Sequence, residues 1–305
     1  MASTTRRIAV GSVTLEVTEQ GQGEPVVLLH GMPGPSYSWR HQLPALAAAG
    51  FRAVAPNQRG YGGSDRPTTV EDYALLKFVE DATGLIAAID AGPAHVVGHD
   101  WGAVFAWAIG ALAPERVRSV TAINGPHPTA FFEELLDPQD WRQNQMSWYM
   151  LLFQFPGVAE EWLSKDDFAN LRHFGLGTAA PGTFSDEDVE VIVGQFREEG
   201  ALTAALNYYR ANVPPTILLG SAPELPPVGV PTMVIWGEQD LYLGTGGLER
   251  SLAKATGPLR VERLPGVSHW VQDEVPDVVN RLLVEFLTEH RGAAAASSIV
   301  AAAAQ

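Results

Sequence analysis

The residues with the clearest chemical meaning form a short turn, Gly98-His99-Asp100-Trp101-Gly102. The turn follows an apolar strand-like run and precedes an Ala-rich apolar segment, which is the strand–turn–helix setting of a nucleophile elbow. Glycine suits both ends because a Cβ there would clash with the adjacent strand or helix. The helix dipole would stabilise the Asp100 carboxylate at the helix start. The alternative is an aspartate that only caps the helix.

Serine is the usual residue at the centre of such a turn, and its replacement by Asp100 changes the predicted chemistry. A carboxylate attacks an sp3 carbon that bears a leaving group, and the product is an alkyl–enzyme ester. A water molecule activated by histidine must then hydrolyse that ester. The turn therefore favours epoxide opening or carbon–halogen cleavage over esterase, lipase and peptidase reactions.

A second turn, His30-Gly31-Met32-Pro33-Gly34, ends an earlier apolar run. In a fold with a nucleophile elbow, such a loop supplies one backbone N–H of the oxyanion hole, and the residue after the nucleophile supplies the other. Met32 and Trp101 are therefore the predicted donors, which stabilise the charge that develops when water attacks the ester. The alternative is an ordinary Gly/Pro-rich turn.

An acid and a histidine must follow the nucleophile in chain order. Asp240, at the end of a strand-like run, is the predicted acid, with Glu238 in reserve and an ordinary surface loop as the alternative. The other position for an acid, after the run 117–123, holds Asn124. His269 follows a late strand and precedes an amphipathic helix, so it is the predicted base, held in the correct tautomer by Asp240.

The elements that must position these side chains alternate along the chain. Continuous apolar runs are typical of strands buried on both faces, and helix-length segments separate them. This alternation predicts an α/β fold with a mainly parallel sheet and helices on both faces. The predicted strands are 7–10 and 13–17, which form a hairpin, then 25–30, 52–55, 94–97, 117–123, 231–236 and 260–264, and the predicted helices are 39–49, 70–91 and 102–113.

The alternation stops near Asn124 and resumes at Val230. The segment between is rich in Trp, Tyr and Phe, has a helical pattern and contains no clear buried strand. We therefore expect a core made of residues 1–128 and 230–291, a helical cap over 129–229, and an Ala-rich disordered tail over 292–305. The segment from Thr129 to Val228 holds 15 acidic and 5 basic residues, a net charge of −10. This charge indicates a solvated outer face and favours neutral over anionic substrates.

Composition excludes several classes of protein. The chain has 305 residues, 46% of them hydrophobic, which is enough for one large core with an insertion. Its net charge of −15 opposes binding to nucleic acid. It has no cysteine, which excludes disulfides and cysteine nucleophiles and fits a reducing cytoplasm. The sequence shows neither the apolar stretch of a signal peptide nor a membrane span.

Taken together, these motifs resemble the α/β-hydrolases of the soluble epoxide hydrolase type, and the resemblance runs from Ile8 to Arg291. Several of the motifs are shared with dehalogenases, whereas the two matching segments of the cap are discriminating. The matching segments are 30–33, 37–40, 59–62, 98–102, 153–160, 206–210 and 266–270.

The resemblance adds two tyrosines to the site. In that family, two cap tyrosines hydrogen-bond the epoxide oxygen and act as the acid, and they correspond here to Tyr149 and Tyr209. An alkoxide is a poor leaving group, so a neutral phenol suits this role; the alternative is that both rings only pack in the cap. Pro33, Trp148 and Tyr208 are assigned to the substrate pocket, with packing as the alternative for the two aromatic residues. The reaction requires neither a metal nor an organic cofactor.

Two other functions stay open. A haloalkane dehalogenase would use the same aspartate and histidine, but a halide needs N–H donors, and this chain has Met32 where asparagine is typical. A haloacid dehalogenase would need cations for the substrate carboxylate, which Trp101 and the acidic cap do not supply. A non-catalytic binding protein on the same fold is the third candidate. The expected partner is a small neutral epoxide, and the sequence leaves a homodimer open.

Overall fold

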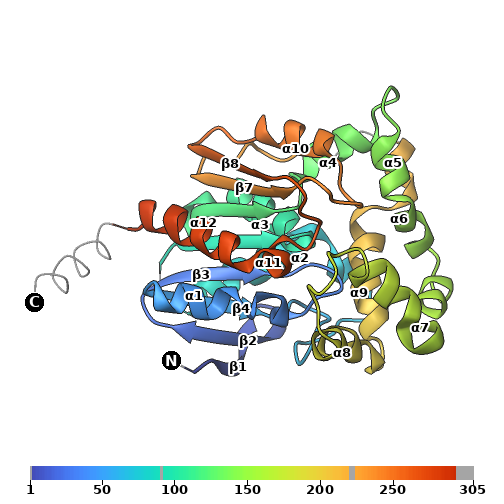
Figure 1. The fold of residues 1–305 in the computed structure, drawn as a ribbon, viewed down its shortest axis with the longest axis horizontal. Helices are drawn as coiled ribbons and strands as arrows, with labels where there is room; N and C mark the ends of the chain where they lie inside the picture. Colours follow the sequence, from blue (N-terminus) through green and yellow to red (C-terminus); the bar gives the residue numbers. More distant parts are fainter. Residues whose placement is uncertain (1, 90–91, 220–223, 293–305) are drawn as a thin grey trace, which may run out of the picture.

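A central β-sheet of eight strands organises the core in the computed structural model, which describes residues 2–89, 92–219 and 224–292 (Figure 1). The strand order is β1-β2-β4-β3-β5-β6-β7-β8. β2 pairs antiparallel with β1 and β4, and the other neighbours are parallel. The strands are β1 (Thr4–Val10), β2 (Val13–Gly21), β3 (Glu24–Leu29), β4 (Phe51–Pro56), β5 (Ala94–His99), β6 (Val117–Ile123), β7 (Thr232–Gly237) and β8 (Leu259–Leu264).

The burial of β5, β7 and β2 accounts for the sequence patterns from which these strands were predicted. Every residue of β5 and β7 is buried, because helices cover both faces of the sheet there, and both strands read as continuous apolar runs. β2 alternates buried and partly exposed residues, since the N-terminal ribbon has one solvated face. The predicted α/β fold is confirmed, and each predicted strand is present.

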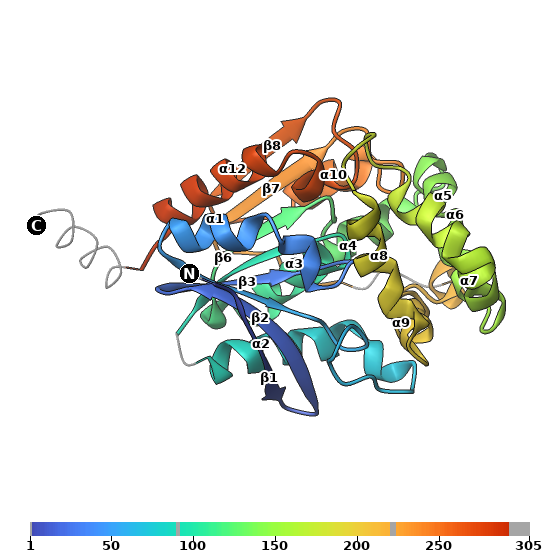
Figure 2. The same cartoon turned by 60° about the horizontal axis from the view of Figure 1, so that its bottom comes forward.

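Two helical layers cover the sheet (Figure 2). On one face, α1 (Gln42–Ala48) packs against α12 (Pro276–Glu289), and both bury apolar side chains in one cluster with Val26 and Ile235. On the other face, α2 (Leu75–Ala88) packs against α3 (Trp101–Leu112) over Val27 and Val96. These two layers fix the carboxyl ends of the parallel strands, where loops meet.

The chain between β6 and β7 is helical in its described part, as the sequence predicted. This segment lies beside the carboxyl ends of the strands in Figures 1 and 2. Its first helix already packs on the core, against α10 (Thr245–Leu252). The cap limits at 129 and 229 stay predictions. The helices of the segment are α4 (Pro128–Leu135), α5 (Arg142–Met146), α6 (Trp148–Phe153), α7 (Val158–Leu171, with non-helical backbone at 165–168), α8 (Asp186–Gly194) and α9 (Ala201–Asn212).

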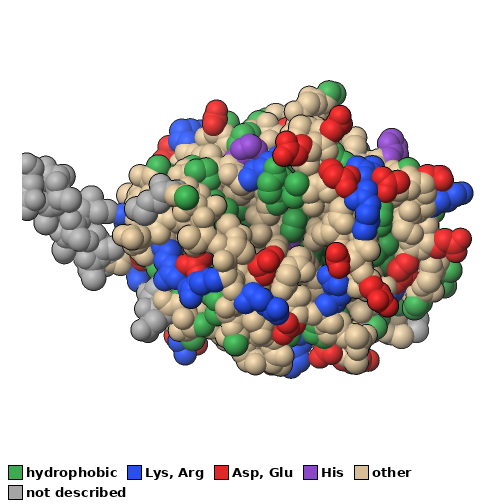
Figure 3. Space-filling model, turned by 90° about the horizontal axis from the view of Figure 1, so that it is seen from below, with side chains coloured by type: hydrophobic (Ala, Val, Ile, Leu, Met, Phe, Trp, Pro, Cys, Tyr) green, Lys and Arg blue, Asp and Glu red, His purple; other side chains and the backbone are tan. Residues whose placement is uncertain are grey.

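Many of the acidic side chains in this segment have basic partners. Glu190 pairs with Arg172 and Arg197, and Glu160 pairs with Arg210. On the face drawn in Figure 3, acidic and basic side chains are interspersed. Several acidic side chains of this segment therefore lie in local ion pairs, while its net charge stays −10.

The tail was predicted from residue 292, but the backbone N–H of Gly292 donates to Glu24 at 3.2 Å, and residues 293–305 lie outside the described part. Within the described ranges, no helix is long and apolar enough to cross a membrane.

Candidate active site

The turn between β5 and α3 holds Asp100 in a conformation that side chains rarely adopt. Its φ is 55° and its ψ is −122°, which costs on the order of 1–3 kcal/mol for a residue other than glycine. A Cβ on Gly98 would lie 2.0 Å from the carbonyl oxygen of Gly102, and a Cβ on Gly102 would lie 2.0 Å from that of Leu29. Both glycines are therefore required for strand, turn and helix to approach this closely, as the sequence predicted.

The Asp100 carboxylate faces the predicted oxyanion loop. The backbone N–H of Met32 donates to Oδ1 at 2.9 Å, and the N–H of Trp101 also bonds the carboxylate. A Cβ on Gly31 would lie 2.2 Å from Oδ1, so only glycine leaves room for the nucleophile. The structure thus brings together the nucleophile and both predicted donors.

His269 stands between two carboxylates. Its Nδ1 lies 2.6 Å from Asp240 Oδ2, and its Nε2 lies 3.7 Å from Asp100 Oδ2. With Nδ1 protonated and bonded to Asp240, Nε2 keeps a lone pair that faces Asp100. A water molecule held beside Asp100 could therefore lose a proton to this nitrogen.

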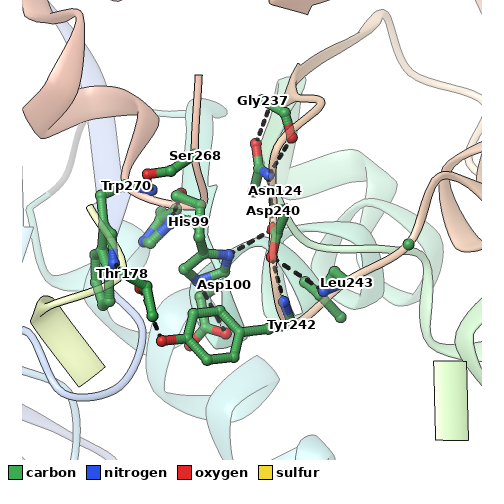
Figure 4. Close-up of polar contacts among 12 residues, drawn as sticks. His99, Asp100, Asn124, Thr178, Gly237, Asp240, Tyr242, Leu243, Ser268 and Trp270 are labelled. Atoms are coloured by element: carbon green, nitrogen blue, oxygen red, sulfur yellow. Dashed lines mark hydrogen bonds and ion pairs between the residues drawn. The ribbon is translucent and has the colours of Figure 1, made fainter. Parts of the chain in front are cut away.

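Asp240 accepts hydrogen bonds at both of its oxygens (Figure 4). The backbone N–H groups of Tyr242 and Leu243 donate to Oδ1 at 2.7 and 3.0 Å. The amide of Asn124 donates to Oδ2 at 2.7 Å, and its own oxygen accepts from Gly237 N at 2.7 Å. In the sequence, Asn124 was noted only as a missing acid. The signal that could have found it is its place at the end of the strand beside β7.

The reserve acid, Glu238, lies elsewhere. Its carboxylate pairs with Arg263 at 3.6 Å, and a third of its side chain is exposed. His269 has its contact with Asp240 instead, which is buried.

Charge and burial oppose each other at the base and the nucleophile. Burial lowers the pKa of His269, but the negative charges of Asp240 and Asp100 outweigh burial and raise it overall. Burial raises the pKa of Asp100, although His269 and the two backbone donors counteract it. The site therefore holds a desolvated carboxylate beside a histidine that is readily protonated.

Tyr149 on α6 and Tyr209 on α9 line the same cavity as Asp100. Both are nearly buried, and their ring centroids are 5.9 Å apart. Burial, together with the Asp100 charge, raises the pKa of each phenol well above its ordinary value, so both stay protonated donors. The structure thus brings both tyrosines and Asp100 to one cavity, and the part of the phenols in the reaction stays a prediction.

Two of the three predicted pocket residues lie elsewhere. The Tyr208 ring is fully buried among Phe78, Phe105 and Tyr61, and its hydroxyl donates to the Arg59 carbonyl at 2.9 Å. Its assignment to the pocket was wrong, because adjacent residues on a helix point about 100° apart.

Trp148 precedes Tyr149 on α6 and is 52% exposed. It lines a separate recess beside Leu151, away from Asp100, so its assignment to the pocket was also wrong. Pro33, in contrast, lies beside Asp100, as expected.

The structure adds residues that the sequence did not single out. Tyr242 packs its ring 5.1 Å from that of His269, and its hydroxyl bonds the Phe174 carbonyl and, at 2.9 Å, the Thr178 hydroxyl. The indole N–H of Trp270 donates to the same Thr178 hydroxyl at 3.1 Å. These contacts join the core loops around His269 to the cap. They form only when cap and core are docked, so no local sequence motif predicts them.

Other polar residues near the site do not form a metal centre. Burial lowers the pKa of His30 to about 4, and its Nε2 accepts the Gln58 N–H at 3.0 Å. Burial and the neighbouring His269 lower the pKa of His99, so this histidine is also neutral. In the part of the chain that the structure describes, no group of three or more His, Cys, Asp or Glu residues could hold a metal ion.

Comparison with known proteins agrees with this geometry. A family model described as the alpha/beta hydrolase fold matches residues 24–276. The chain is 35% identical to epoxide hydrolase A of Mycobacterium tuberculosis over 94% of its own length and 98% of that protein. It is 36% identical to the AB hydrolase superfamily protein YfhM of Bacillus subtilis, over 92% and 96% of the two chains. Among solved structures, an inhibitor complex of the Bacillus megaterium epoxide hydrolase matches with a TM-score of 0.84 and 32% identity, over 93% and 100%.

Proposed function

The chain belongs to the alpha/beta hydrolase family, and we propose that it is an epoxide hydrolase, which adds water to an epoxide and releases a vicinal diol. The observation that carries this proposal is the pair of buried, protonated tyrosines that share one cavity with a carboxylate nucleophile. The reaction proceeds in two steps, and each step uses a different part of the site.

Ring opening uses the nucleophile and the tyrosines. An Asp100 oxygen attacks one ring carbon and forms a C–O ester bond while the ring C–O bond breaks. The electron pair of the broken bond goes to the ring oxygen, which Tyr149 and Tyr209 stabilise by hydrogen bonds as one of them transfers its proton. The result is an Asp100 ester of the β-hydroxyalkyl group.

Ester hydrolysis uses the base and the oxyanion donors. His269 Nε2 takes a proton from water, and the hydroxide adds to the ester carbonyl of Asp100. Asp240, fixed by Asn124, stabilises the imidazolium that forms. The N–H groups of Met32 and Trp101, which already face this carboxylate, stabilise the tetrahedral oxyanion. Collapse breaks the ester C–O bond, the imidazolium protonates the departing diol oxygen, and the proton of the new Asp100 carboxyl returns to the tyrosine, which restores the site.

A haloalkane dehalogenase is the second candidate, since it would use the same nucleophile and base. It requires N–H donors for a halide, and the Trp101 side chain is already hydrogen-bonded to Tyr209. The cavity instead presents hydroxyl donors, which suit an oxygen leaving group. Halide release from chloroalkanes without diol release from styrene oxide would favour the dehalogenase.

Isotope labelling tests the covalent route. In a single turnover in H₂¹⁸O, we expect the first diol to carry unlabelled oxygen and the label to enter the Asp100 carboxylate, because the diol oxygen comes from the enzyme. Mass spectrometry of the diol and of the peptide containing Asp100 measures both. Label in the first diol would contradict the ester intermediate.

The base is tested separately. We expect His269→Gln to accumulate the ester, visible as an added substrate mass on the intact protein. Normal steady-state turnover by His269→Gln would refute the assignment of the base.

Location and assembly belong to the same proposal. The absence of cysteine from the sequence favours a reducing cytoplasm, and localisation of the tagged protein tests this. We propose a homodimer, and sedimentation equilibrium tests it. We further propose that the substrate is neutral, because Asp100 and the acidic cap repel anions.

A further inference from the structure

Asp100 lies where two cavities of very different size meet. The larger cavity has a volume of about 290 Å³, and the smaller one about 20 Å³. Asp100, Tyr149 and Tyr209 line both of them, whereas His269 lines only the smaller. The reacting groups therefore stand at the junction, with unequal space on the two sides.

The larger cavity is walled by apolar side chains. Among the described residues that line it, Asp100 carries the only charge. The one amide, that of Asn212, is already bonded to the Tyr73 carbonyl at 2.8 Å and to the Leu75 N–H at 2.7 Å. Such a cavity accepts a neutral apolar group. Its apolar walls include Leu75, Val104, Phe131, Phe132, Met150 and Leu243.

The smaller cavity has room for about one water molecule, which needs roughly 10–15 Å³ by the same kind of measure. Its position beside His269 suits the water that hydrolyses the ester. A methyl or phenyl group at this place would displace that water and press on the walls. The small cavity therefore holds the water for ester hydrolysis and leaves no room for a carbon substituent during ring opening.

Hydrogen bonds between core and cap fix the walls of the small cavity. The Tyr242 hydroxyl bonds the carbonyls of Phe174 and Gly175, and Trp270 bonds Thr178. The Phe174 ring packs edge-on against Tyr149 and Tyr242, with centroid distances of 5.0 and 5.5 Å. A substituent could enter only by breaking contacts from both sides of the site.

We propose that the substrate carries its substituents on one ring carbon only: a terminal epoxide with a single apolar aryl or alkyl group. This inference rests on the proposed function. The two tyrosines hold the ring oxygen, and one ring carbon lies over Asp100. Substituents on the two ring carbons then point in different directions, and only the two cavities offer space for them. The substituent occupies the larger cavity, and Phe174, Tyr242 and Trp270 exclude a group on the other carbon.

A matched pair of substrates tests the proposal. Styrene oxide has one substituted carbon, and trans-β-methylstyrene oxide adds a single methyl group to the other carbon. We expect kcat/KM of the wild-type enzyme to fall by at least about tenfold for the methylated compound, as one misplaced methyl group in a tight pocket commonly costs 10–200-fold. Diol formation by chromatography gives both values.

A pair of variants separates steric exclusion from the intrinsic reactivity of the two epoxides. Phe174→Ala removes a wall of the small cavity. In this variant we expect the ratio of kcat/KM for styrene oxide to kcat/KM for the methylated compound to fall by about tenfold. Phe132→Ala widens the larger cavity and should leave the ratio near the wild-type value. Phe174→Leu keeps an apolar side chain, which supports folding, and should lower this ratio by a smaller factor.

Two outcomes would overturn the inference, and a third would overturn the proposed function on which it rests. A wild-type enzyme that hydrolyses both epoxides within about twofold would overturn it and leave the proposed function standing. A ratio that changes in Phe132→Ala, but in neither Phe174 variant, would show that the exclusion does not come from this wall. Diol formation from neither compound would overturn the proposed function itself.

Discussion

The Asp100 carboxylate, seen as a single residue, is held in two opposing ways. Burial raises its pKa, while His269 and the N–H groups of Trp101 and Met32 favour the charged form. The overall shift of its pKa is upward, so the ionised carboxylate is poorly solvated, which favours attack on carbon. Alkylation then converts it into a neutral ester, so the charge that acts on His269 changes within the cycle.

We expect the pKa of His269 to fall when the charge of Asp100 is removed. The charge of Asp100 is one of the causes that raise the pKa of this histidine, and Asp100→Asn imitates the neutral ester in this respect. A lower pKa leaves more of the imidazole neutral, which is the form that takes a proton from water. NMR titration of the imidazole protons in wild type and Asp100→Asn measures the difference. An unchanged or higher pKa in the variant would contradict this coupling.

The two tyrosines predict the alkaline side of the pH profile. Burial and the Asp100 charge raise the pKa of Tyr149 and Tyr209 well above the ordinary 10.0. Both phenols therefore remain protonated at pH 10, and kcat/KM should show no decline up to that pH. On the acid side, kcat/KM falls as the pH passes through the pKa of Asp100, which must be ionised for ring opening, and kcat falls as His269, which must be neutral for ester hydrolysis, becomes protonated. A decline between pH 8 and 10 that Tyr149→Phe abolishes would show that a phenol ionises there.

At this scale the sequence predicts the elbow better than the cap. Asp100, Asp240 and His269 are identifiable because each follows a strand, and strand ends meet at one edge of a parallel sheet. The assignment of Tyr208 to the pocket was wrong, although its neighbour Tyr209 lies there, since the two differ only in rotation about α9. Asn124 was missed because its contact with Asp240 joins residues that are 116 positions apart.

One partly buried arginine, Arg40, links elements around the site. Arg40, just after a short 3-10 helix (Ser36–Trp39), bonds Asp273 on α11 (Val271–Glu274) and, at 2.9 Å, Asp188 on α8. Burial raises the pKa of Asp273 to about 7, even though Arg40 lowers it. One guanidinium thus ties a cap helix to the helix that follows the catalytic histidine.

We expect Arg40→Ala to destabilise the protein most at alkaline pH. Removing one partner of a buried ion pair costs about 3–5 kcal/mol when the other stays charged. Asp273 has a folded-state pKa of about 7, so it is charged above that pH, and the loss should grow as the pH rises through it. Urea denaturation at pH 5 and pH 9 measures the difference in unfolding free energy.

Asp273→Asn provides the matched control for this prediction. The double variant Arg40→Ala/Asp273→Asn no longer contains the buried Asp273 charge, so stability at pH 9 should recover in part, although Asp188 still lacks its Arg40 partner. A loss in Arg40→Ala that is the same at both pH values, or no recovery in the double variant, would contradict the role given to the Asp273 charge.

The strands could be predicted from the sequence more readily than the contacts of Arg40, and the reason is physical. β5 and β7 are buried on both faces, so their sequences are mostly apolar, with His95, His99 and Thr232 as buried exceptions, and this pattern is visible locally. The contacts of Arg40 need a docked cap, and the residues concerned are spread from position 40 to position 273. Nothing in the composition of any one segment specifies them.

In the whole molecule, the two steps of the reaction draw on different parts of the chain. Asp100, His269, Asp240, Met32 and Trp101 follow strands of the core, whereas Tyr149 and Tyr209 lie on cap helices. Ring opening therefore requires a docked cap, while the groups for ester hydrolysis all come from the core. The contacts of Tyr242 and Trp270 with the loop at 174–178 join the two sets.

The pairing of β6 with β7 across the inserted segment has a consequence for how such an enzyme can change. Val120 pairs with Thr232 and Ile123 with Ile235, so the ladder continues as if the insertion were absent. Doubling the length of such a connection costs only about 0.6 kcal/mol in closure entropy, because the ends are already fixed side by side. A lineage can therefore lengthen, trim or exchange this segment with little effect on the sheet. Changes in this segment alter which epoxides are opened, whereas the core residues that hydrolyse the ester stay the same.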